Sequence, residues 1–184
     1  LHGSSAASDV YKRQFYNLEN LFDTINDTSK RDEASPIMEM KYNRSEVYNK
    51  KIKNLSKVIS GIGFEETKTL PTIVGLCEVE NKNVVEDLIN SDLLKNANYG
   101  ISHFDSPDER VIDVELIYRK NMFKILNENS AYLELKYASG KINYTRDQLV
   151  VEGVLENEKI YIIVNHWPSR SGGELGSRPY LSLI

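Results

Sequence analysis

Apolar positions recur along the chain at two spacings, and each spacing predicts a different kind of element. Helical spacing follows Asn43 and ends near Gly61, and a second helical stretch follows Asn83. Each asparagine has a glutamate three residues later, which is the spacing of a capping box. The apolar positions of the two predicted helices are Tyr48, Ile52, Leu55, Ile59, Val84, Val85, Leu88 and Ile89.

Short apolar or alternating runs between these stretches predict strands. Residues 23–43 are polar and rich in turn formers, so we expect a loop there, and Asn157-Glu158 should form a hairpin turn. Two crossovers containing helices, followed by consecutive strands, indicate helices covering a mixed sheet in one domain. The predicted strands are residues 15–17, 72–77, 99–104, 111–119, 143–155 and 159–165.

The two ends of the sequence resemble something other than protein. Residues 4–14 read as the translation of a transposase sequencing adapter, and residues 181–184 match the reverse complement of that adapter's end. We therefore expect residues 1–14 and 181–184 to be adapter artefacts. The natural part would be residues 15–180, an incomplete domain cut at both ends.

Composition narrows the class of protein. Charged residues make up 27% and hydrophobic residues 40% of the 184, so a packed core is expected. The net charge of −4 argues against broad electrostatic attraction to nucleic acid, but it does not exclude a phosphate bound through a metal ion. A single cysteine, Cys77, allows no internal disulfide, and no apolar run is long enough to span a membrane.

Several chemically capable side chains stand where predicted strands end. Glu78 follows a buried run, a place where carboxylates often bind ligands or metals. Glu80 is a weaker candidate because it is closer to the expected helix start. Asn17 ends the first strand, and His166 leaves the last one as a candidate acid, base or phosphate donor. Taken singly, each residue type is more often structural than functional.

Two cationic segments complete the set of candidates. Arg146 precedes a strand with alternating apolar positions, where it could also be a surface arginine paired with a neighbouring acid. Ser169 and Arg170 lie in a flexible, hydroxyl-bearing loop that suits phosphate but is also typical of ordinary turns. Asp113 and Glu115 fall inside a predicted strand, and we interpret them as structural or solvent-facing.

In this order, the segments resemble the endonuclease/exonuclease/phosphatase superfamily. FYNLENLFD at residues 15–23 is similar to its first motif, and GLCEVEN at residues 75–81 is similar to the motif with the metal-binding glutamate. Residues 106–119 resemble a segment common in bacterial members. TRDQL at residues 145–149 resembles the region with a phosphate-site arginine, and VNHWPS at residues 164–169 the motif with the catalytic histidine. The match covers nearly all of residues 15–180.

The resemblance implies an α+β fold, a two-sheet β-sandwich flanked by helices, that cleaves phosphate esters with Mg²⁺ or Mn²⁺. By this resemblance Glu78 is a metal ligand and Asn17 supports both metal and phosphate. His166 would stabilise the pentavalent phosphorus or assist proton transfer, and Arg146 would counter charge on the phosphate oxygens. Asn17, Glu78, Arg146 and His166 should therefore converge at one edge of the sheets.

The chain departs from the family pattern in three ways. The family has glycine where Val111 stands and a small apolar residue where Glu115 stands. No Gly-Asp-Phe-Asn-like or Ser-Asp-His-like motif follows His166, so about half of the expected site is encoded. We expect the uninterrupted gene to continue into those motifs, and we expect this fragment to be inactive alone.

The functional interpretation is a bacterial metal-dependent phosphoesterase that hydrolyses phosphodiester or phosphomonoester bonds, with a nuclease as the leading hypothesis. Its partner would be a phosphate-ester substrate, nucleic acid being one candidate. One alternative is a phosphatase or sphingomyelinase-like phospholipase, which shares the core site and differs in its loops. Another is a non-catalytic binding module that keeps the fold.

Overall fold

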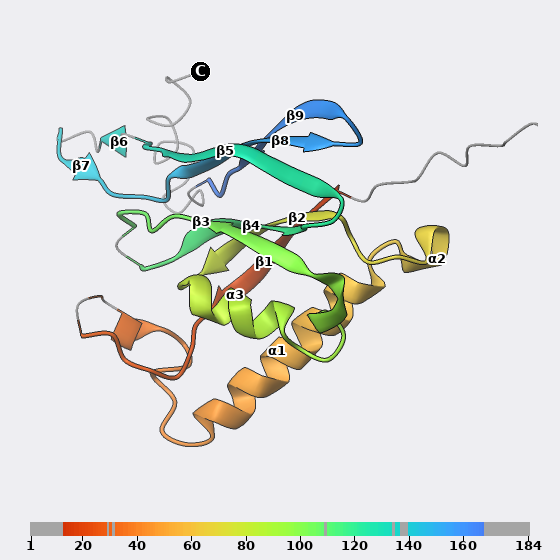
Figure 1. Ribbon diagram of the computed structural model, residues 1–184. Helices are drawn as coiled ribbons and strands as arrows, with labels where there is room; N and C mark the ends of the chain where they lie inside the picture. The colour runs from red at the N-terminus through yellow and green to blue at the C-terminus, as the bar shows by residue number, and fades with distance from the viewer. Residues whose placement is uncertain are drawn as a thin grey trace, which may run out of the picture.

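Two β-sheets pack face to face, with helices on the outer face of one of them (Figure 1). The structure is a computed structural model that describes residues 13–28, 30, 32–108, 110–133, 135–136 and 140–167. The first sheet has the strand order β1-β2-β4-β3. β1 (Arg13–Leu21) runs parallel to β2 (Ile73–Val79), whereas β4 (Asp113–Arg119) is antiparallel to both β2 and β3 (Tyr99–His103).

The second sheet is antiparallel throughout, with the order β5-β8-β9. β5 (Phe123–Ala131) pairs with β8 (Gln148–Leu155), which forms a hairpin with β9 (Glu158–Val164). Every second residue of β8 is buried, as its alternating sequence predicts. A small separate ribbon joins β6 (Leu135–Lys136) to β7 (Ile142–Asn143).

Two helices cover the first sheet on the side away from β5, β8 and β9 (Figure 1). The longer is α1 (Arg44–Gly61), the second is α3 (Lys82–Ile89), and the short α2 (Phe64–Thr67) follows α1. Short 3-10 turns occupy η1 (Asp32–Ala34) and η2 (Lys95–Ala97). The predicted apolar positions of α1, namely Tyr48, Ile52, Leu55 and Ile59, are all buried against this face of the sheet.

Both predicted capping boxes are wrong. Asn43 is the N-cap residue of α1, as predicted, but its φ is 60° and its side chain makes no capping hydrogen bond. The second helix begins at Lys82, one residue before Asn83, and its cap is Asn81, which accepts a hydrogen bond from the Val84 amide at 3.2 Å. The spacing of apolar residues thus predicted the two helices, but it did not predict that Asn81 caps the first turn of α3.

A second apolar core fills the space between the sheets. Its side chains come from the inward faces of β2, β4, β5, β8 and β9, and Phe123 at the start of β5 is the largest of them. The others are Ile73, Cys77, Val114, Leu116, Leu149, Val151, Leu155 and Val164. The α+β sandwich predicted from the sequence is thereby confirmed.

Three features of the second sheet differ from expectation. β5 was not predicted, because its second half is polar and exposed and lacks an apolar alternation. Residues 144–147 are not strand, so the long run predicted over 143–155 is interrupted. The hairpin turn lies at Glu156 and Asn157, both with positive φ, one residue earlier than predicted.

Among the described helices, none has the length and apolar character needed to cross a bilayer.

Candidate active site

Glu78 is the extra residue of a β-bulge in β2. Cys77 pairs with Val114 of β4 and Val79 pairs with Asp113, so the residue between them has no counterpart on β4. Its φ of 60° lies in the left-handed region, which residues other than glycine rarely adopt. Bulges often re-aim a side chain beside a functional site, where the surrounding structure maintains the strain. The bulge directs the carboxylate toward β1 and the end of β9.

The last part of β1 supplies two hydrogen-bond donors to this carboxylate. Nδ2 of Asn17 donates to Oε1 of Glu78 at 3.0 Å, and the amide of Asn20 donates to Oε2 at 3.0 Å. Glu19 and Asn20 have positive φ, which turns the amide toward β2. Lys51 of α1 fixes this distorted segment by donating to the Glu19 and Asn20 carbonyls at 2.5 and 2.9 Å. The carboxylate is therefore oriented before any ligand binds.

Asn17 presents its amide nitrogen, not its oxygen, to Glu78. Its Oδ1 accepts a hydrogen bond from the Glu19 amide at 2.7 Å. In this arrangement Asn17 orients the glutamate, whereas its expected support of a metal ion and a phosphate stays a prediction.

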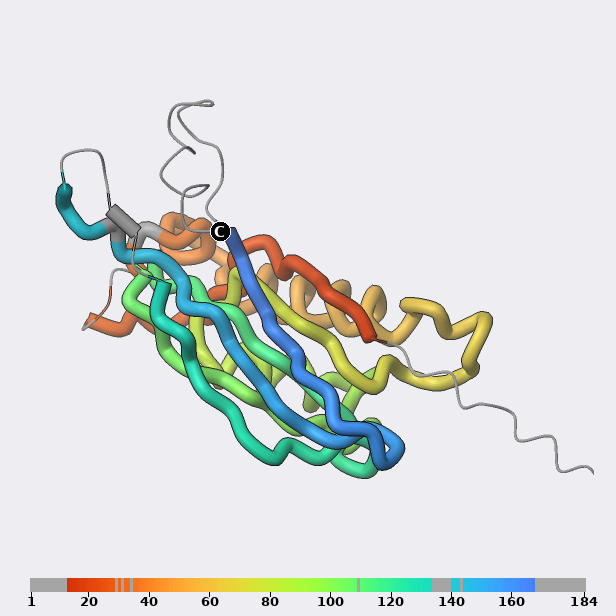
Figure 2. Tube along the Cα trace, turned by 90° about the horizontal axis from the view of Figure 1, so that it is seen from above, coloured from red at the N-terminus to blue at the C-terminus, as the bar shows by residue number. Residues whose placement is uncertain are grey.

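In Figure 2 the second sheet lies over the first, with β9 (blue) along its edge. His166 reaches the same site from this sheet, two residues after β9 ends. Its Nε2 lies 3.5 Å from Oε1 of Glu78. The close approach of β9 to β2 depends on Gly75, where a β-carbon would lie 3.3 Å from the Val164 methyls. Burial lowers the pKa of His166, an effect that the nearby Glu78 partly offsets. Its buried Nδ1 has no hydrogen-bond partner among the described residues.

Arg146 lies beneath His166 and is almost fully buried, with 3% of its surface exposed. Its Nε and Nη2 donate to the His166 carbonyl at 3.2 and 3.0 Å, and Nη1 donates to Oδ2 of Asp108 at 3.0 Å. Asp108 also accepts a hydrogen bond from the Arg110 amide. The guanidinium is thus engaged with the backbone of the histidine and with a buried acid. Its expected role toward phosphate oxygens stays a prediction.

The structure therefore joins all four predicted residues through direct contacts, in the order Asn17, Glu78, His166 and Arg146. Ser169 and Arg170, the predicted substrate-binding residues, lie outside the described residues. Sequence reasoning gave no role to Asp108 or to Lys51. Asp108 lies within residues 106–119, the segment that resembles bacterial family members. Nothing in the sequence spacing links it to Arg146, which is 38 residues away.

Val111 and Glu115, where the sequence departs from the family pattern, both stand in unusual surroundings. Val111 has a φ of 56°, a conformation that glycine adopts freely and a β-branched residue rarely does. Glu115 is fully buried and Asp113 nearly so, which excludes the solvent-facing interpretation of both residues. Oε1 of Glu115 lies 2.8 Å from Nδ1 of His103.

Glu80, the weaker carboxylate candidate, faces a different cavity. It is 3% exposed and accepts a hydrogen bond from the Asp23 amide at 2.7 Å. Burial raises its pKa to about 7, with a further contribution from Asp23 and Asp32. The cavity it lines has a volume of about 670 Å³ and also includes His103. Glu80 and Glu78, although two residues apart, therefore belong to separate surroundings.

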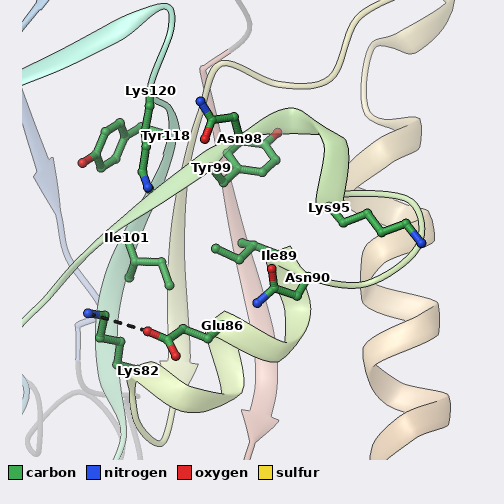
Figure 3. Close-up of a pocket in the computed structure, with 11 residues that line it drawn as sticks. Lys82, Glu86, Ile89, Asn90, Lys95, Asn98, Tyr99, Ile101, Tyr118 and Lys120 are labelled. Carbon is green, nitrogen blue, oxygen red and sulfur yellow. Dashed lines mark ion pairs between the residues drawn. The ribbon is translucent and has the colours of Figure 1, made fainter.

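Another cavity, of about 510 Å³, lies between α3 and β3 (Figure 3). Tyr99, Ile101 and Tyr118 contribute to its wall, and Lys82 pairs across one end with Glu86 at 3.7 Å. None of the four predicted site residues lines it.

The donor set around Glu78 fits a hard divalent cation. Each carboxylate oxygen accepts one hydrogen bond from β1 and keeps further lone pairs, because a carboxylate offers about four acceptor positions. Mg²⁺ sites commonly use one or two carboxylates together with water and substrate phosphate oxygens. Glu78 can supply such a ligand, and the neutral imidazole of His166 stands beside it without adding positive charge.

Two solved structures share this fold. A humanized D. rerio TDP2 carrying 14 mutations is 15% identical, with a TM-score of 0.52 over 91% of this chain and 51% of that chain. An endonuclease/exonuclease/phosphatase from Bacteroides vulgatus is 18% identical, with a TM-score of 0.52 over 93% and 56%. The chain thus spans about half the length of these structures, and at such identities the likeness shows the fold alone.

Two sequence comparisons differ in outcome. The comparison with curated protein sequences finds no match to this chain, whereas the comparison with family profiles does. The profile of the Endonuclease/Exonuclease/phosphatase family matches residues 13–182, which is most of the sequence. The chain belongs to the Endonuclease/Exonuclease/phosphatase family.

Proposed function

We propose that the chain carries the Glu78 half of a metal-dependent phosphoesterase that hydrolyses phosphodiester or phosphomonoester bonds. The observation that supports this most is the Glu78 carboxylate itself. It sits on a strained bulge, receives two hydrogen bonds from β1 and faces His166 at 3.5 Å. A merely structural acid has no need of a left-handed backbone conformation and an adjacent imidazole.

Glu78 would hold the cation, and Mg²⁺ or Mn²⁺ suits its oxygen ligands. When bound, such an ion neutralises the phosphate and polarises the phosphoryl oxygen. Asn17 and the Asn20 amide keep the carboxylate pointing into the site. Because the amide of Asn17 lies at the same edge, it can also donate to a phosphate oxygen after a small rotation.

His166 is the group that moves a proton or donates to the phosphate. Burial lowers its pKa, so the imidazole is neutral at neutral pH and can accept a proton at Nε2. Arg146 positions it by donating two hydrogen bonds to its backbone carbonyl. Asp108 balances the charge of that arginine. The residues of this chain thus bind, orient and exchange a proton at one place.

Nuclease activity is the leading hypothesis for the kind of phosphoesterase. However, the net charge of −4 and the acidic cavity beside Glu80 weaken the electrostatic attraction of a long polyanion such as nucleic acid. Substrate class therefore has to be measured with DNA, inositol phosphates and sphingomyelin side by side. Turnover is best assayed both on this chain and on the B. vulgatus family member, because the chain spans 56% of that structure.

The decisive experiment compares Glu78→Gln with Glu66→Gln, an exposed acid on α2 that serves as the matched control. Mn²⁺ binding is followed by calorimetry, and hydrolysis by release of product from each substrate. Glu78→Gln should weaken Mn²⁺ binding at least tenfold and lower any turnover by about 100-fold or more, because the main ligand is lost. Glu66→Gln should change neither.

Equal Mn²⁺ affinity and turnover in the two variants would overturn the proposal. Metal-dependent binding of a phosphate ester without hydrolysis, in the longer family member as well, would instead favour a binding module.

A further inference from the structure

A second group of metal-ligating side chains lies at the neighbouring end of the first sheet. His103 ends β3, Asp105 follows it in the connection to β4, and Asp113 begins β4. One ligand atom from each lies within 4.8 Å of the other two. None of these residues contacts Glu78 or His166 in the described structure, and the site does not depend on the function proposed above.

Glu115 gives this cluster a feature that an ordinary acidic surface lacks. It is the cross-strand partner of His103 and is 0% exposed. Burial raises its pKa to about 7. A buried acid costs free energy unless a charged or hydrogen-bonding partner satisfies it. That partner is Nδ1 of His103, which lies 2.8 Å from Oε1 of Glu115.

The orientation of the imidazole follows from that contact. With Nδ1 facing Glu115, Nε2 faces the other way, 3.6 Å from Oδ1 of Asp105. Metal-binding histidines commonly donate one ring N–H to a carboxylate while the other nitrogen binds the ion. Glu115, His103 and the two aspartates reproduce this arrangement.

Hydrogen bonds also hold the side chain of Asp113 in place. Its Oδ1 accepts hydrogen bonds from the amide and the hydroxyl of Ser106, which fix the orientation of the carboxylate. Asp113 is buried and Asp105 is exposed, so a metal here would be reached from the 670 Å³ cavity that contains His103 and Asp105. The cluster thus combines fixed ligands with an open approach.

The local charge also favours a cation. The cavity contains Asp23, Asp27, Glu80 and Asp105, in addition to the aspartate and glutamate behind His103. Lys30 lies 3.1 Å from Asp105 and compensates part of this charge. Lys82 is turned toward Glu86 of its own helix and is paired with it (Figure 3). More negative than positive groups therefore surround the cluster.

We propose that His103, Asp105 and Asp113 bind a Zn²⁺ ion, with Glu115 as the positioning carboxylate of His103. One imidazole and two carboxylates suit Zn²⁺ better than Mg²⁺ or Ca²⁺, which prefer all-oxygen ligands. Three protein ligands leave a fourth position to water. The ion would brace the connection between β3 and β4, which also carries Asp108, the partner of Arg146.

The test measures Zn²⁺ binding to the whole chain by calorimetry in a Glu78→Gln background, so that the other site does not contribute. One equivalent should bind. Asp105→Asn and His103→Gln should each weaken binding at least tenfold, while Asp92→Asn, an exposed acid paired with Lys95, should leave it unchanged. Because Asp105 is exposed, its variant should fold even if that of His103 does not.

Two further variants separate a metal site from a network built around Lys30. Glu115→Ala, which places a small apolar residue where the family resemblance predicts one, should weaken Zn²⁺ binding about 10- to 100-fold without unfolding the chain. Lys30→Gln removes the competing ammonium and should leave binding equal or tighter. Absence of Zn²⁺ binding, or binding that Asp105→Asn and Glu115→Ala both leave unchanged, would overturn the proposal.

Discussion

The Val164 methyl groups lie against the backbone of Gly75 on the facing sheet, so close that a β-carbon on the glycine would be 3.3 Å from both of them. The same β-carbon would lie 3.2 Å from the Phe15 ring. Val164 is two residues before His166, and Gly75 is three residues before Glu78. The absence of one side chain therefore sets how closely the histidine approaches the carboxylate.

Gly75→Ala should lower the free energy of unfolding by about 1–2 kcal/mol, because the added methyl overfills a packed interface. Gly61→Ala at the end of α1 is the control, since a β-carbon there meets nothing within 4 Å and alanine favours the helix. Urea unfolding of both variants checks this, and equal stability would show that β9 moves aside freely.

At position 111, glycine should be more stable than alanine. Elsewhere alanine is the more stable of the two by about 0.5–1 kcal/mol. Here the left-handed φ of 56° costs any residue with a β-carbon about 1–2 kcal/mol, so the order should reverse. Thermal unfolding of Val111→Gly and Val111→Ala compares variants that both lack the valine methyls. An alanine variant at least as stable as the glycine variant would argue against strain at this position.

Arg146→Gln should destabilise the protein by about 3 kcal/mol, because it removes the buried ion-pair partner of Asp108. The double variant with Asp108→Asn should lose clearly less than the two single changes together. Arg110→Gln is the control, since this exposed arginine also contacts Asp108, at 3.6 Å, and should cost less than about 1 kcal/mol. Additive losses in the double variant would show that the buried pair is not coupled.

Glu80 should make stability fall as pH rises in metal-free buffer. Burial raises its folded-state pKa from 4.5 to about 7, so the folded protein binds a proton more tightly than the unfolded chain does. The resulting stability is complete below pH 4.5 and is lost as pH rises through 7. Glu80→Gln should remove about 1–2 kcal/mol of this dependence, a value reduced for solvent screening. Identical pH profiles for the two proteins would contradict this.

The sequence predicted the helices and most strands because those elements have strong periodic patterns. Tyr48, Ile52, Leu55 and Ile59 share one face of α1 as their spacing requires. Caps depend on a single hydrogen bond rather than on a pattern, and Asn81 was missed for that reason. β5 was missed because an exposed, polar strand is defined by its neighbour β8 and not by its own residues.

The candidate site could be predicted only as a set of residues. Motif order placed Asn17, Glu78, Arg146 and His166 together, and the structure joins them by contact. What each atom faces depends on backbone geometry that no motif encodes. The bulge at Glu78 and the engagement of Arg146 with the His166 carbonyl both require the folded chain.

The parallel pairing of β1 with β2 also determines when, during folding, the site can form. β8 and β9 are joined by a two-residue turn, and such hairpins form within microseconds. The contact between Asn17 and Glu78 spans 61 residues, including all of α1, and must wait for that long loop to close. A refolding chain that has formed its helices and the β8–β9 hairpin but has not paired β1 with β2 would therefore still have no site.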